Sequence, residues 1–324
     1  MKQLGKDLLV SLVIGFLLPG LILNFGARVR EETLQELTRQ EDPPQEEIQQ
    51  SVLPVKVRTQ DGTITHQQMD DYLVGVLLAE MPASFAPEAL KAQSVVARTY
   101  ARKAYTTKGK HGDGSVCTDP ACCQGFCPED VYLQQGGDPE DVDNIRSAVL
   151  ATSGQVLTYD GELIEATYFS CSGGSTEDAL AVWGTDFPYL QAVDSPGEER
   201  AVHYQETVDF SKTDLEEALG ITLVGHPESW VQTVSYTRGG GVDAISIGGT
   251  FFTGTEIRQI LGLRSTAFSI SASEDSIAIT TRGYGHRVGM SQYGADAMAQ
   301  AGSTYDEILM YYYQGAVLTR VDGK

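Results

Sequence analysis

The stretch EMPASFAPEALKAQSVVARTYA, residues 80–101, decides most of the fold prediction because one helix ends in it and another begins. Apolar residues before it recur at helical spacing. Pro82 disfavours helical dihedral angles in the residue that precedes it, so the first helix should end at about Glu80. Pro87 suits the first turn of a second helix, and the alanine-rich sequence favours helix from there to about Ala104.

Outward from these two helices, the pattern predicts short strands and further helices. The expected strands are 52–58, 156–159, 163–170, 231–237 and 243–247, and the expected later helices are 214–219, 254–261, 291–300 and 305–312. Strands and helices do not alternate regularly, which favours an α+β fold with a mixed helix and sheet core. We predict a catalytic core from 52–206 and 276–324, into which a smaller α+β subdomain, 207–275, is inserted.

Composition excludes one class of partner. The chain has 324 residues and a formal net charge of −21, with 23 Lys and Arg against 44 Asp and Glu. Phosphate binding needs clustered cations, so we expect no nucleic-acid partner. Five cysteines are too few for a disulfide scaffold, and an odd number cannot all pair within the chain.

The amino terminus carries an apolar run, Leu8 to Phe25, that contains no charged residue. It is close to the roughly 20 residues that cross a hydrocarbon core, so we predict one membrane-anchoring helix within 1–30. The alternative is a cleaved signal peptide, although 24–27 match a cleavage site poorly. Residues 31–51 are rich in Glu and Gln and predict an acidic, solvated stalk.

Glu80 is the strongest candidate for catalysis. It lies at the carboxyl end of an apolar helix, where burial and the helix dipole both raise the pKa of a carboxyl group. A carboxylic acid that stays protonated near neutral pH can donate a proton to a glycosidic oxygen. The alternative is a helix-end glutamate that is only solvated or capped. No second acid stands at comparable spacing in the same block, because Glu88 falls in the next helix.

The second helix has a cationic face, with Lys91, Ser94, Arg98 and Arg102 at spacings of three or four. This face is either an ordinary solvated surface or a place where an anionic group binds beside Glu80. Cations that close would also lower the pKa of Glu80.

Together these residues resemble the stage II sporulation protein D family, which includes proteins described as enhancers of cell-wall amidases. The stretch at 80–101 resembles the family's signature. Four further blocks agree and occur in the expected order, namely HGDGSVCTDPACCQGF (111–126), YFSCSGGSTEDALAVWGTDFPYLQAV (168–193), LGLRST (261–266) and RGYGHRVGMSQYGADAMAQAG (282–302).

The resemblance implies lytic transglycosylation of peptidoglycan. A family member would cleave the β-1,4 bond between N-acetylmuramic acid and N-acetylglucosamine and leave a 1,6-anhydro sugar. Glu80 matches the catalytic acid and would act in turn as acid and base. The substrate-binding positions implied by the resemblance are Lys91, Arg98, Ser170, Gly173, Gly174 and Tyr189. Trp183 is a further candidate for stacking on a sugar, although such an aromatic residue is as often part of the core.

The loop at 111–127 resembles the family's zinc-binding loop. The implied ligands are His111, Cys117, Cys122 and Cys123, where the position of Cys122 is usually histidine. Four protein ligands would fill a tetrahedral shell and make the zinc structural. Cys127 is an alternative to Cys122, since neighbouring residues do not easily bind one ion. Disulfide bonding is the other interpretation, and it is plausible for a protein outside the cytoplasm.

The family also implies a setting. The catalytic part would lie outside the cytoplasm on a single-pass anchor in the mother-cell membrane, facing the septal space during engulfment. Partners would be peptide-stripped glycan strands, a sporulation amidase and a polytopic membrane protein. The alternative function is a non-catalytic glycan-binding enhancer of an amidase. His286 is compatible with a catalytic, metal-binding or packing role, and Arg287 replaces a glycine that is more usual there.

Overall fold

The two helices around Glu80 form as the sequence predicts. In the computed structural model, which describes residues 54–321, helix α2 spans Met69–Glu80. Met81 has extended dihedral angles, φ −137° and ψ 133°, as expected of a residue before proline. Helix α3 spans Pro87–Thr107, with proline in its first turn. Lys108, with φ 67°, is its carboxyl-terminal cap.

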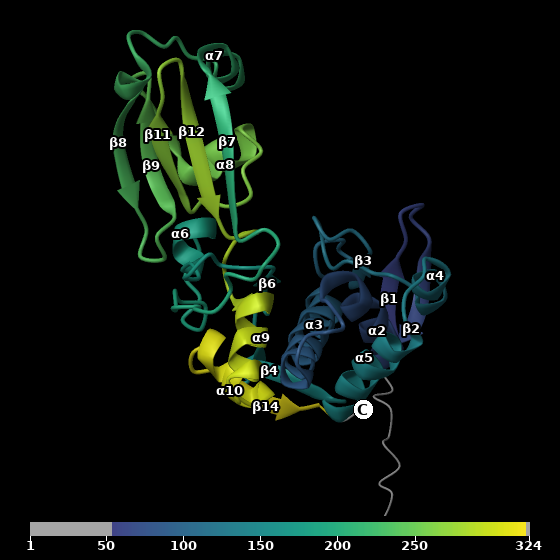
Figure 1. Cartoon of the computed structure of the whole chain (residues 1–324). Coiled ribbons are helices and arrows are strands. Elements are labelled where there is room, and N and C mark those ends of the chain that lie inside the picture. The colour runs from purple at the N-terminus through teal and green to yellow at the C-terminus, as the bar shows by residue number, and fades with distance from the viewer. Residues whose placement is uncertain (1–53, 322–324) are drawn as a thin grey trace, which may run out of the picture. The chain divides into compact units, whose positions relative to one another are not determined.

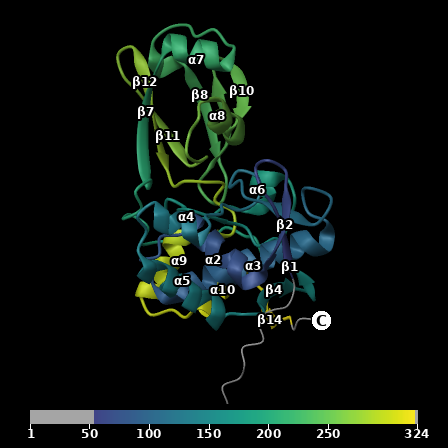
Figure 2. The same ribbon diagram turned by 90° about the vertical axis from the view of Figure 1, so that its right-hand side faces the viewer.

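Helix α3 is the centre of the larger hydrophobic core. Figures 1 and 2 show it beside α2 and α5 (Pro139–Ala151) and beside α9 (Gln292–Gln300) and α10 (Tyr305–Tyr312). It is buried over most of its first four turns, where small residues let the neighbouring helices approach closely. The fully or almost fully buried apolar residues of α3 are Ala89, Leu90, Ala92, Val95, Val96, Ala97 and Ala101. Removing this surface from water is the main stabilising contribution of the helix.

Three small sheets border this core. The first has the order β2–β1–β3, and its strands are β1 (Pro54–Arg58), β2 (Ile64–Gln68) and β3 (Ser115–Cys117). The second has the order β14–β4–β5, from β14 (Val317–Arg320), β4 (Gln155–Tyr159) and β5 (Glu162–Leu163). The third pairs β6 (Tyr168–Phe169) with β13 (Met290–Ser291) in parallel, and this pair brings the 168–193 block beside the 282–302 block.

Residues 205–282 form a module with its own hydrophobic cluster. One sheet has the order β11–β12–β7, from β11 (Phe268–Ala272), β12 (Ser276–Arg282) and β7 (Gln205–Ser211). The other has the order β10–β9–β8, from β10 (Thr250–Thr253), β9 (Val242–Ile247) and β8 (Val231–Tyr236). Two helices, α7 (Lys212–Leu219) and α8 (Gly254–Ile260), each begin with a capping box, and a 3-10 turn, η1, spans Pro227–Ser229. Strand β12 lies beyond the boundary at 275 that we expected, because it pairs with β7 along seven residues.

The α+β class is confirmed, and two details differ from expectation. The loop-rich region after 111 contains helix α4 (Glu129–Gln134) before α5, and no strong apolar periodicity announces α4, which has no buried residue. The expected strand at 163–170 is broken into β5 and β6, because Ile164 and Ala166 turn into the core between them. Helix α6 spans Ala179–Trp183.

The predicted membrane anchor and the acidic stalk lie outside the described residues. Within residues 54–321, no helix combines the length and apolar character needed to cross a bilayer. The described residues all belong to one compact unit, 50–324.

Candidate functional site

Glu80 is the last residue of α2 and is half-buried. The chain turns away at Met81, and a pocket of about 270 Å³ lies at this turn. The pocket is lined by Leu78, Ala79, Glu80, Met81, Pro82, Ala83, Tyr132 and Ile145. Of these described lining residues, Glu80 is the only carboxylate, so the pocket contains a single acid.

The segment directly after Cys123 holds the carboxyl group of Glu80. The backbone amide of Gly125 donates a hydrogen bond to Glu80 Oε1. A Cβ atom on Gly125 would lie 2.9 Å from that oxygen and 3.3 Å from the Cβ of Ala79, so only glycine permits this approach without displacement. Phe126 then packs over Gly75, and its ring stacks on Tyr72 with centroids 5.6 Å apart.

A second contact reaches Glu80 through side chains. Gln124 is fully buried, and its Oε1 accepts a hydrogen bond of 3.0 Å from the hydroxyl of Tyr72. Its Nε2 donates a hydrogen bond of 3.2 Å to the hydroxyl of Tyr168 on β6. The hydroxyl of Tyr168 lies close enough to the carboxyl group of Glu80 to lower the pKa of that group.

These surroundings have opposing effects on the pKa of Glu80. Burial is the largest and raises the pKa, because it disfavours the charged form. The hydrogen bond from Gly125 and the nearby hydroxyl of Tyr168 lower the pKa, because both favour the carboxylate. Burial wins, and the pKa of Glu80 lies above its ordinary value. A group in this state can give up a proton and remain stabilised as an anion afterwards.

Lys91 and Arg98, the two basic residues of α3 that the resemblance implies in substrate binding, lie in different surroundings. Lys91 is partly exposed, pairs with Glu88 at 2.6 Å and lies 6.0 Å from the centre of the Tyr305 ring. Arg98 is only 1% exposed. Its guanidinium binds Asp70 Oδ1 at 3.1 Å and the backbone carbonyl of Thr152 at 2.8 Å. Among the described residues neither cation pairs with Glu80.

Arg98 therefore lacks the exposed side chain that the substrate-binding role implied by the resemblance needs. Its guanidinium is an internal cation that joins α2, α3 and the end of α5, and its buried donors face carbonyl groups instead of solvent. A glycan could reach it only if this ion pair opened. Lys91, by contrast, keeps an accessible ammonium group.

The Gly173–Gly174 segment is held from two sides. Glu198 is fully buried and accepts hydrogen bonds from the amides of Ser172 and Gly173. Arg287, in the left-handed region with φ 65°, donates to the carbonyl of Ser172 at 2.8 Å. It also donates to the carbonyls of Ser175 and Gly239, each at 2.7 Å, and to Glu177 Oε1 at 3.2 Å.

The two glycines that the resemblance implies in substrate binding differ: Gly173 must be glycine, whereas Gly174 is open to solvent. Gly173 has φ +77°, and a Cβ atom there would lie 2.6 Å from the backbone carbon of Arg282. Gly174 is exposed, has φ +123° and would place a Cβ atom in open space. Ser170 accepts a hydrogen bond of 3.0 Å from the amide of Tyr293, so its carbonyl points at α9.

The two aromatic candidates for sugar binding, Tyr189 and Trp183, differ in exposure. Tyr189 is 7% exposed, and its hydroxyl accepts a hydrogen bond of 3.0 Å from the amide of Glu165, so it belongs to the core and not to a sugar-binding surface. Trp183 is 41% exposed and rests on the ring of His286, with centroids 5.4 Å apart. Burial lowers the pKa of His286 to about 4, and its Nδ1 accepts from the amide of Val288. The His286 ring also lies against the ring of Phe169, with centroids 5.7 Å apart.

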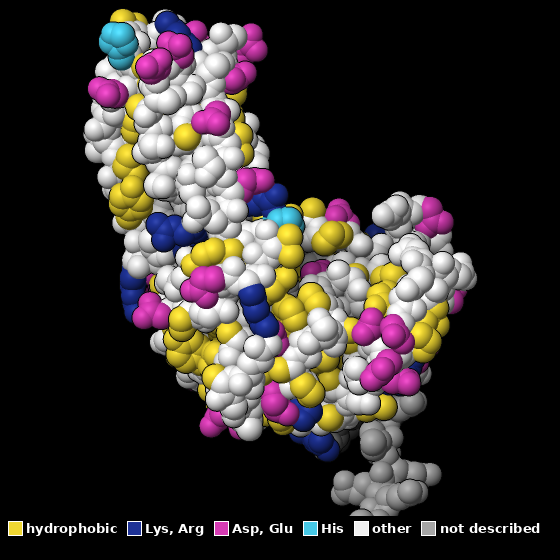
Figure 3. Space-filling model, viewed as in Figure 1, with side chains coloured by type: hydrophobic (Ala, Val, Ile, Leu, Met, Phe, Trp, Pro, Cys, Tyr) yellow, Lys and Arg dark blue, Asp and Glu magenta, His cyan; other side chains and the backbone are white. Residues whose placement is uncertain are grey.

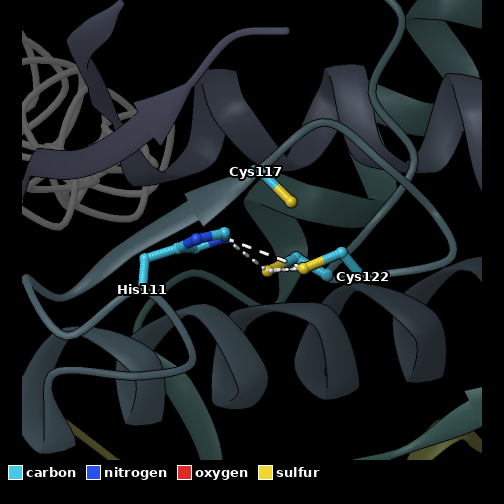
Figure 4. A group of neighbouring side chains, drawn as sticks. His111, Cys117 and Cys122 are labelled. Atoms are coloured by element: carbon cyan, nitrogen blue, oxygen red, sulfur yellow. Dashed lines mark hydrogen bonds between the residues drawn. The ribbon is translucent and has the colours of Figure 1, made fainter. Parts of the chain in front are cut away.

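The cysteine loop brings together the four predicted ligands. One ligand atom from each of His111, Cys117, Cys122 and Cys123 lies within 4.8 Å of all the others. Figure 4 shows the side chains of His111, Cys117 and Cys122 pointing toward a common centre. The cluster could hold a metal ion. Cys127 is outside it, with its sulfur 3.7 Å from the carbonyl of Pro128, and the described cysteines are free thiols.

Sequence reasoning missed the residues that surround Glu80. Gln124, Gly125 and Tyr168 lie far from it in sequence and carry no spacing signal that links them to it. The glycine two residues after Cys123 was the one available hint, because glycine marks places where a backbone approaches another group closely. Glu198 was missed for the same reason, since a buried acid that binds amides has no local pattern.

Comparison with known proteins agrees with these features. The family model described as "Stage II sporulation protein" matches residues 58–159, which include Glu80 and the metal-ligand cluster. The chain is 35% identical to "Stage II sporulation protein D" of Bacillus subtilis (strain 168) over 334 aligned residues, covering 99% of this chain and 97% of the relative. It is 36% identical over 280 residues to the protein of the same name from Bacillus amyloliquefaciens, covering 85% and 81%.

A third relative carries a different description. The "Amidase enhancer" of Bacillus subtilis (strain 168) is 31% identical over 304 residues, which cover 76% of this chain and 40% of that protein. The likeness to the first two relatives extends over 97% and 81% of their lengths, beyond the single domain of the family model. The chain belongs to the stage II sporulation protein D family.

Proposed function

We propose that this chain is a peptidoglycan lytic transglycosylase that acts during engulfment in endospore formation. It cleaves the β-1,4 bond between N-acetylmuramic acid and N-acetylglucosamine and leaves 1,6-anhydro-N-acetylmuramic acid ends. The observation that carries the proposal is Glu80, a carboxyl group with a raised pKa that is the only acid among the described residues lining its pocket.

The surroundings of Glu80 suit a residue that acts twice. As an acid, Glu80 protonates the oxygen that leaves the anomeric carbon. As a carboxylate, it then accepts the proton of the sugar's own 6-hydroxyl while that oxygen attacks the same carbon. Hydrolysing glycosidases need two carboxylates, whereas an intramolecular nucleophile needs only one. The amide of Gly125 and the hydroxyl of Tyr168 stabilise the anion between these steps.

We further propose that the cysteine cluster binds Zn²⁺ in a structural role. In a tetrahedral zinc site with bonds of about 2.3 Å to sulfur and about 2.0 Å to nitrogen, sulfur atoms lie about 3.8 Å apart and sulfur lies about 3.5 Å from nitrogen. The sulfur atoms of Cys122 and Cys123 are 3.9 Å apart, and they lie 3.8 and 3.6 Å from Nε2 of His111. Four protein ligands would leave no open position for substrate.

The location and partners are part of the same proposal. The catalytic part would face the septal space on a single-pass anchor in the mother-cell membrane. It would act with a sporulation amidase, which strips the glycan, and with a polytopic membrane protein. The printed name of one relative, an amidase enhancer, supports a link to an amidase. On the face drawn in Figure 3, acidic side chains are more numerous than basic ones, which agrees with the exclusion of nucleic acid.

The test is product analysis with the full-length chain. Purified protein, Glu80→Gln and Glu80→Ala would each be incubated with peptide-free glycan strands, and mass spectrometry would identify the new ends. We expect anhydro-muramyl ends from the wild type and a loss of about a thousandfold or more in both variants. Glu140→Gln, an exposed acid at the start of α5, is the control and should retain activity. Reducing ends formed with water would instead identify a hydrolase.

A second candidate function is a non-catalytic enhancer of an amidase, and the relative of that name favours it. The same variants separate the two functions. An enhancer would cleave no glycan, would stimulate an added cell-wall amidase, and would do so equally well with Glu80→Gln. If Glu80→Gln loses amidase stimulation together with glycan cleavage, the result supports the transglycosylase.

A further inference from the structure

We propose that Arg287 and Glu177 are positioning residues that fix the 205–282 module to the core and thereby hold Trp183 where it can contact a glycan strand. The inference rests on the proposed function, because it concerns how that substrate is bound. Both side chains are buried, with exposed fractions of 2% for Arg287 and 1% for Glu177, so they act through their neighbours and not by touching the glycan.

The covalent attachment of the module leaves its orientation open. Strand β7 begins at Gln205 and β12 ends at Arg282, and these two residues are paired across the same sheet. Because the two chain crossings lie side by side, they form a single line of attachment of the kind about which domains rotate. A contact from the module's other sheet would stop such a rotation. The turn at 237–241, which connects β8 to β9 of that sheet, makes this contact.

Arg287 binds this turn and the core with one guanidinium group. Its Nη2 donates to the carbonyl of Gly239 in the turn and to the carbonyl of Ser175 in the core, each at 2.7 Å. Its Nε donates to the carbonyl of Ser172 at 2.8 Å. Because the planar guanidinium holds its donors in a fixed fork, these acceptors must keep one relative placement to be satisfied together.

The carboxylate of Glu177 completes the contact. Its Oε1 accepts hydrogen bonds of 2.8 Å from the hydroxyl of Thr237 and from the amide of Gly241. The same oxygen accepts a hydrogen bond of 3.2 Å from Nη1 of Arg287. A buried ion pair adds little net stability, because the removal of its charges from water offsets their attraction. Its directed hydrogen bonds instead favour one orientation of the turn on the core.

The turn and the core are in close contact at this place. A Cβ atom on Gly239 would lie 2.1 Å from the carbonyl oxygen of Thr176, and one on Gly241 would lie 2.4 Å from Oε1 of Glu177. Arg287 itself has φ 65°, in the left-handed region that a residue with a Cβ atom adopts at an energetic cost. Such strain persists where surrounding interactions hold it, which agrees with the four hydrogen bonds of this side chain.

The same pair joins the two segments that carry Trp183 and its support. The amide of Glu177 donates to the carbonyl of Arg287 at 2.6 Å. The next residue, Asp178, is the N-cap of α6, which ends at Trp183. His286 directly precedes Arg287, and the centroid of its ring lies 5.4 Å from that of Trp183. A shift of either segment would therefore displace the exposed indole from its support.

Hydrogen exchange of the full-length chain tests the contact without substrate. Arg287→Gly removes all four hydrogen bonds of the side chain and tolerates the positive φ, so it adds no backbone strain. We expect amides in 172–177 and 237–241 to exchange about tenfold faster or more, while amides within α3 and β11 keep their wild-type rates. Glu177→Ala, which removes the acceptor of the turn, should accelerate the same segments. Faster exchange throughout the molecule would show a merely structural role and would overturn the proposal, as would unchanged exchange in both segments.

A neighbouring ion pair provides the matched control. Arg238 lies in the same turn, and its Nη1 is 3.8 Å from Oδ1 of Asp178, with the arginine side chain 65% exposed. An exposed pair contributes little, so Arg238→Met should leave exchange in both segments unchanged. An equal effect of Arg238→Met would remove the assignment to Arg287. If Arg287→Gly does not fold, Arg287→Lys takes its place, because lysine keeps the charge but lacks the fork that spans these acceptors.

Binding of peptide-free glycan strands tests the consequence for Trp183. Affinity would be measured in the Glu80→Gln background, which is not expected to cleave the strands. Arg287→Gly and Trp183→Ala should each raise Kd about three- to tenfold. The double variant should bind no more weakly than the weaker single variant, because both changes remove the same contact. An unchanged Kd in Arg287→Gly, or increases that multiply in the double variant, would overturn the proposal.

Binding and cleavage together separate this inference from the proposed function. A wild type that binds the strands without cleaving them, with the expected Kd values in the variants, would refute the transglycosylase and retain the role of Arg287. Cleavage with Kd values that do not follow this pattern would retain the enzyme and refute the positioning role. Failure of the parent chain to bind any strand would overturn both.

Discussion

The amide of Gly125 donates a hydrogen bond to the carboxyl group of Glu80, which lies 45 residues earlier in the chain. This contact joins the end of α2 to the segment after the cysteine cluster. The candidate acid is therefore held by a part of the chain whose own position depends on the loop that precedes it. The site and the metal-ligand cluster are one structural unit.

Gly125→Ala should impair catalysis more than folding. Its Cβ would lie 2.9 Å from Oε1 of Glu80, so the carboxyl group must shift and lose its hydrogen bond from the amide. We expect kcat to fall about tenfold or more, with little change in KM. Steady-state kinetics with glycan strands would measure this. Gly62→Ala, at an exposed turn with φ +86° and no atom nearby, is the control, which should cost stability without lowering kcat. A parallel loss of stability and activity would contradict it.

Activity should decline as the pH rises through the pKa of Glu80. The acid must be protonated to react, and burial places its pKa above the ordinary value, so activity extends to higher pH than for an exposed glutamate. The same shift means that the ionised form destabilises the fold above that pKa. Glu80→Gln should therefore melt at a higher temperature than wild type at neutral pH and at the same temperature below the ordinary pKa. Thermal melts across pH would check this, and equal melting at all pH values would refute it.

Arg98→Met should lower the free energy of unfolding. The Arg98–Asp70 pair is buried on both sides, and removing one partner of such a pair costs about 3–5 kcal/mol. Lys91→Met removes a half-exposed pair with Glu88 and should cost no more than about 1 kcal/mol. Urea unfolding compares the two. A stable Arg98→Met variant with a raised KM would instead support the substrate-binding role implied by the resemblance.

Loss of the metal should disturb the position of Glu80 as well as that of the cysteine loop. Cys123→Ser should lower the zinc content, lower Tm and reduce kcat, because Cys123 lies two residues before Gly125. Cys127→Ser is the matched control, since that sulfur lies outside the cluster, and it should leave all three unchanged. Elemental analysis, melting and kinetics are the measurements. Unchanged zinc in Cys123→Ser would rule out the cluster as the metal site.

Trp183 should contribute to glycan binding. Its indole is 41% exposed and is supported from behind by the ring of His286. Stacking on a sugar ring is expected to be of the order of an aromatic pair, so Trp183→Ala should raise KM about three- to tenfold with kcat retained. Leu180→Ala, at an exposed position on the same helix, should not change KM. Equal binding of glycan by both variants would remove Trp183 from the binding surface.

The sequence was sufficient where the signal is local. Pro82 and Pro87 mark the end of α2 and the start of α3, so Glu80 could be placed at a helix end without any tertiary information. The cysteine loop could likewise be recognised, because His111 and three cysteines lie within thirteen residues of sequence, and the fold brings their ligand atoms together. In both cases the residues concerned are neighbours along the chain.

The sequence was insufficient where burial decides the role. Arg98 and Lys91 share a helix face in the pattern, yet one is sealed against Asp70 and the other remains accessible. Tyr189 and Trp183 looked alike as sugar-binding aromatics, and packing makes the first a core residue and leaves the second exposed. Exposure depends on what covers a side chain, and those covering elements come from distant parts of the chain.

The sequence by itself determined the family, the α+β class, the candidate acid and the metal-ligand cluster. Only the tertiary structure decided what surrounds Glu80, namely Gly125, which donates to its carboxyl group, and Tyr168, which accepts a hydrogen bond from Gln124. The physical reason is that a hydrogen bond between residues far apart in sequence leaves no periodicity or spacing behind. It exists because α2, β6 and the segment after the cysteines pack against one another.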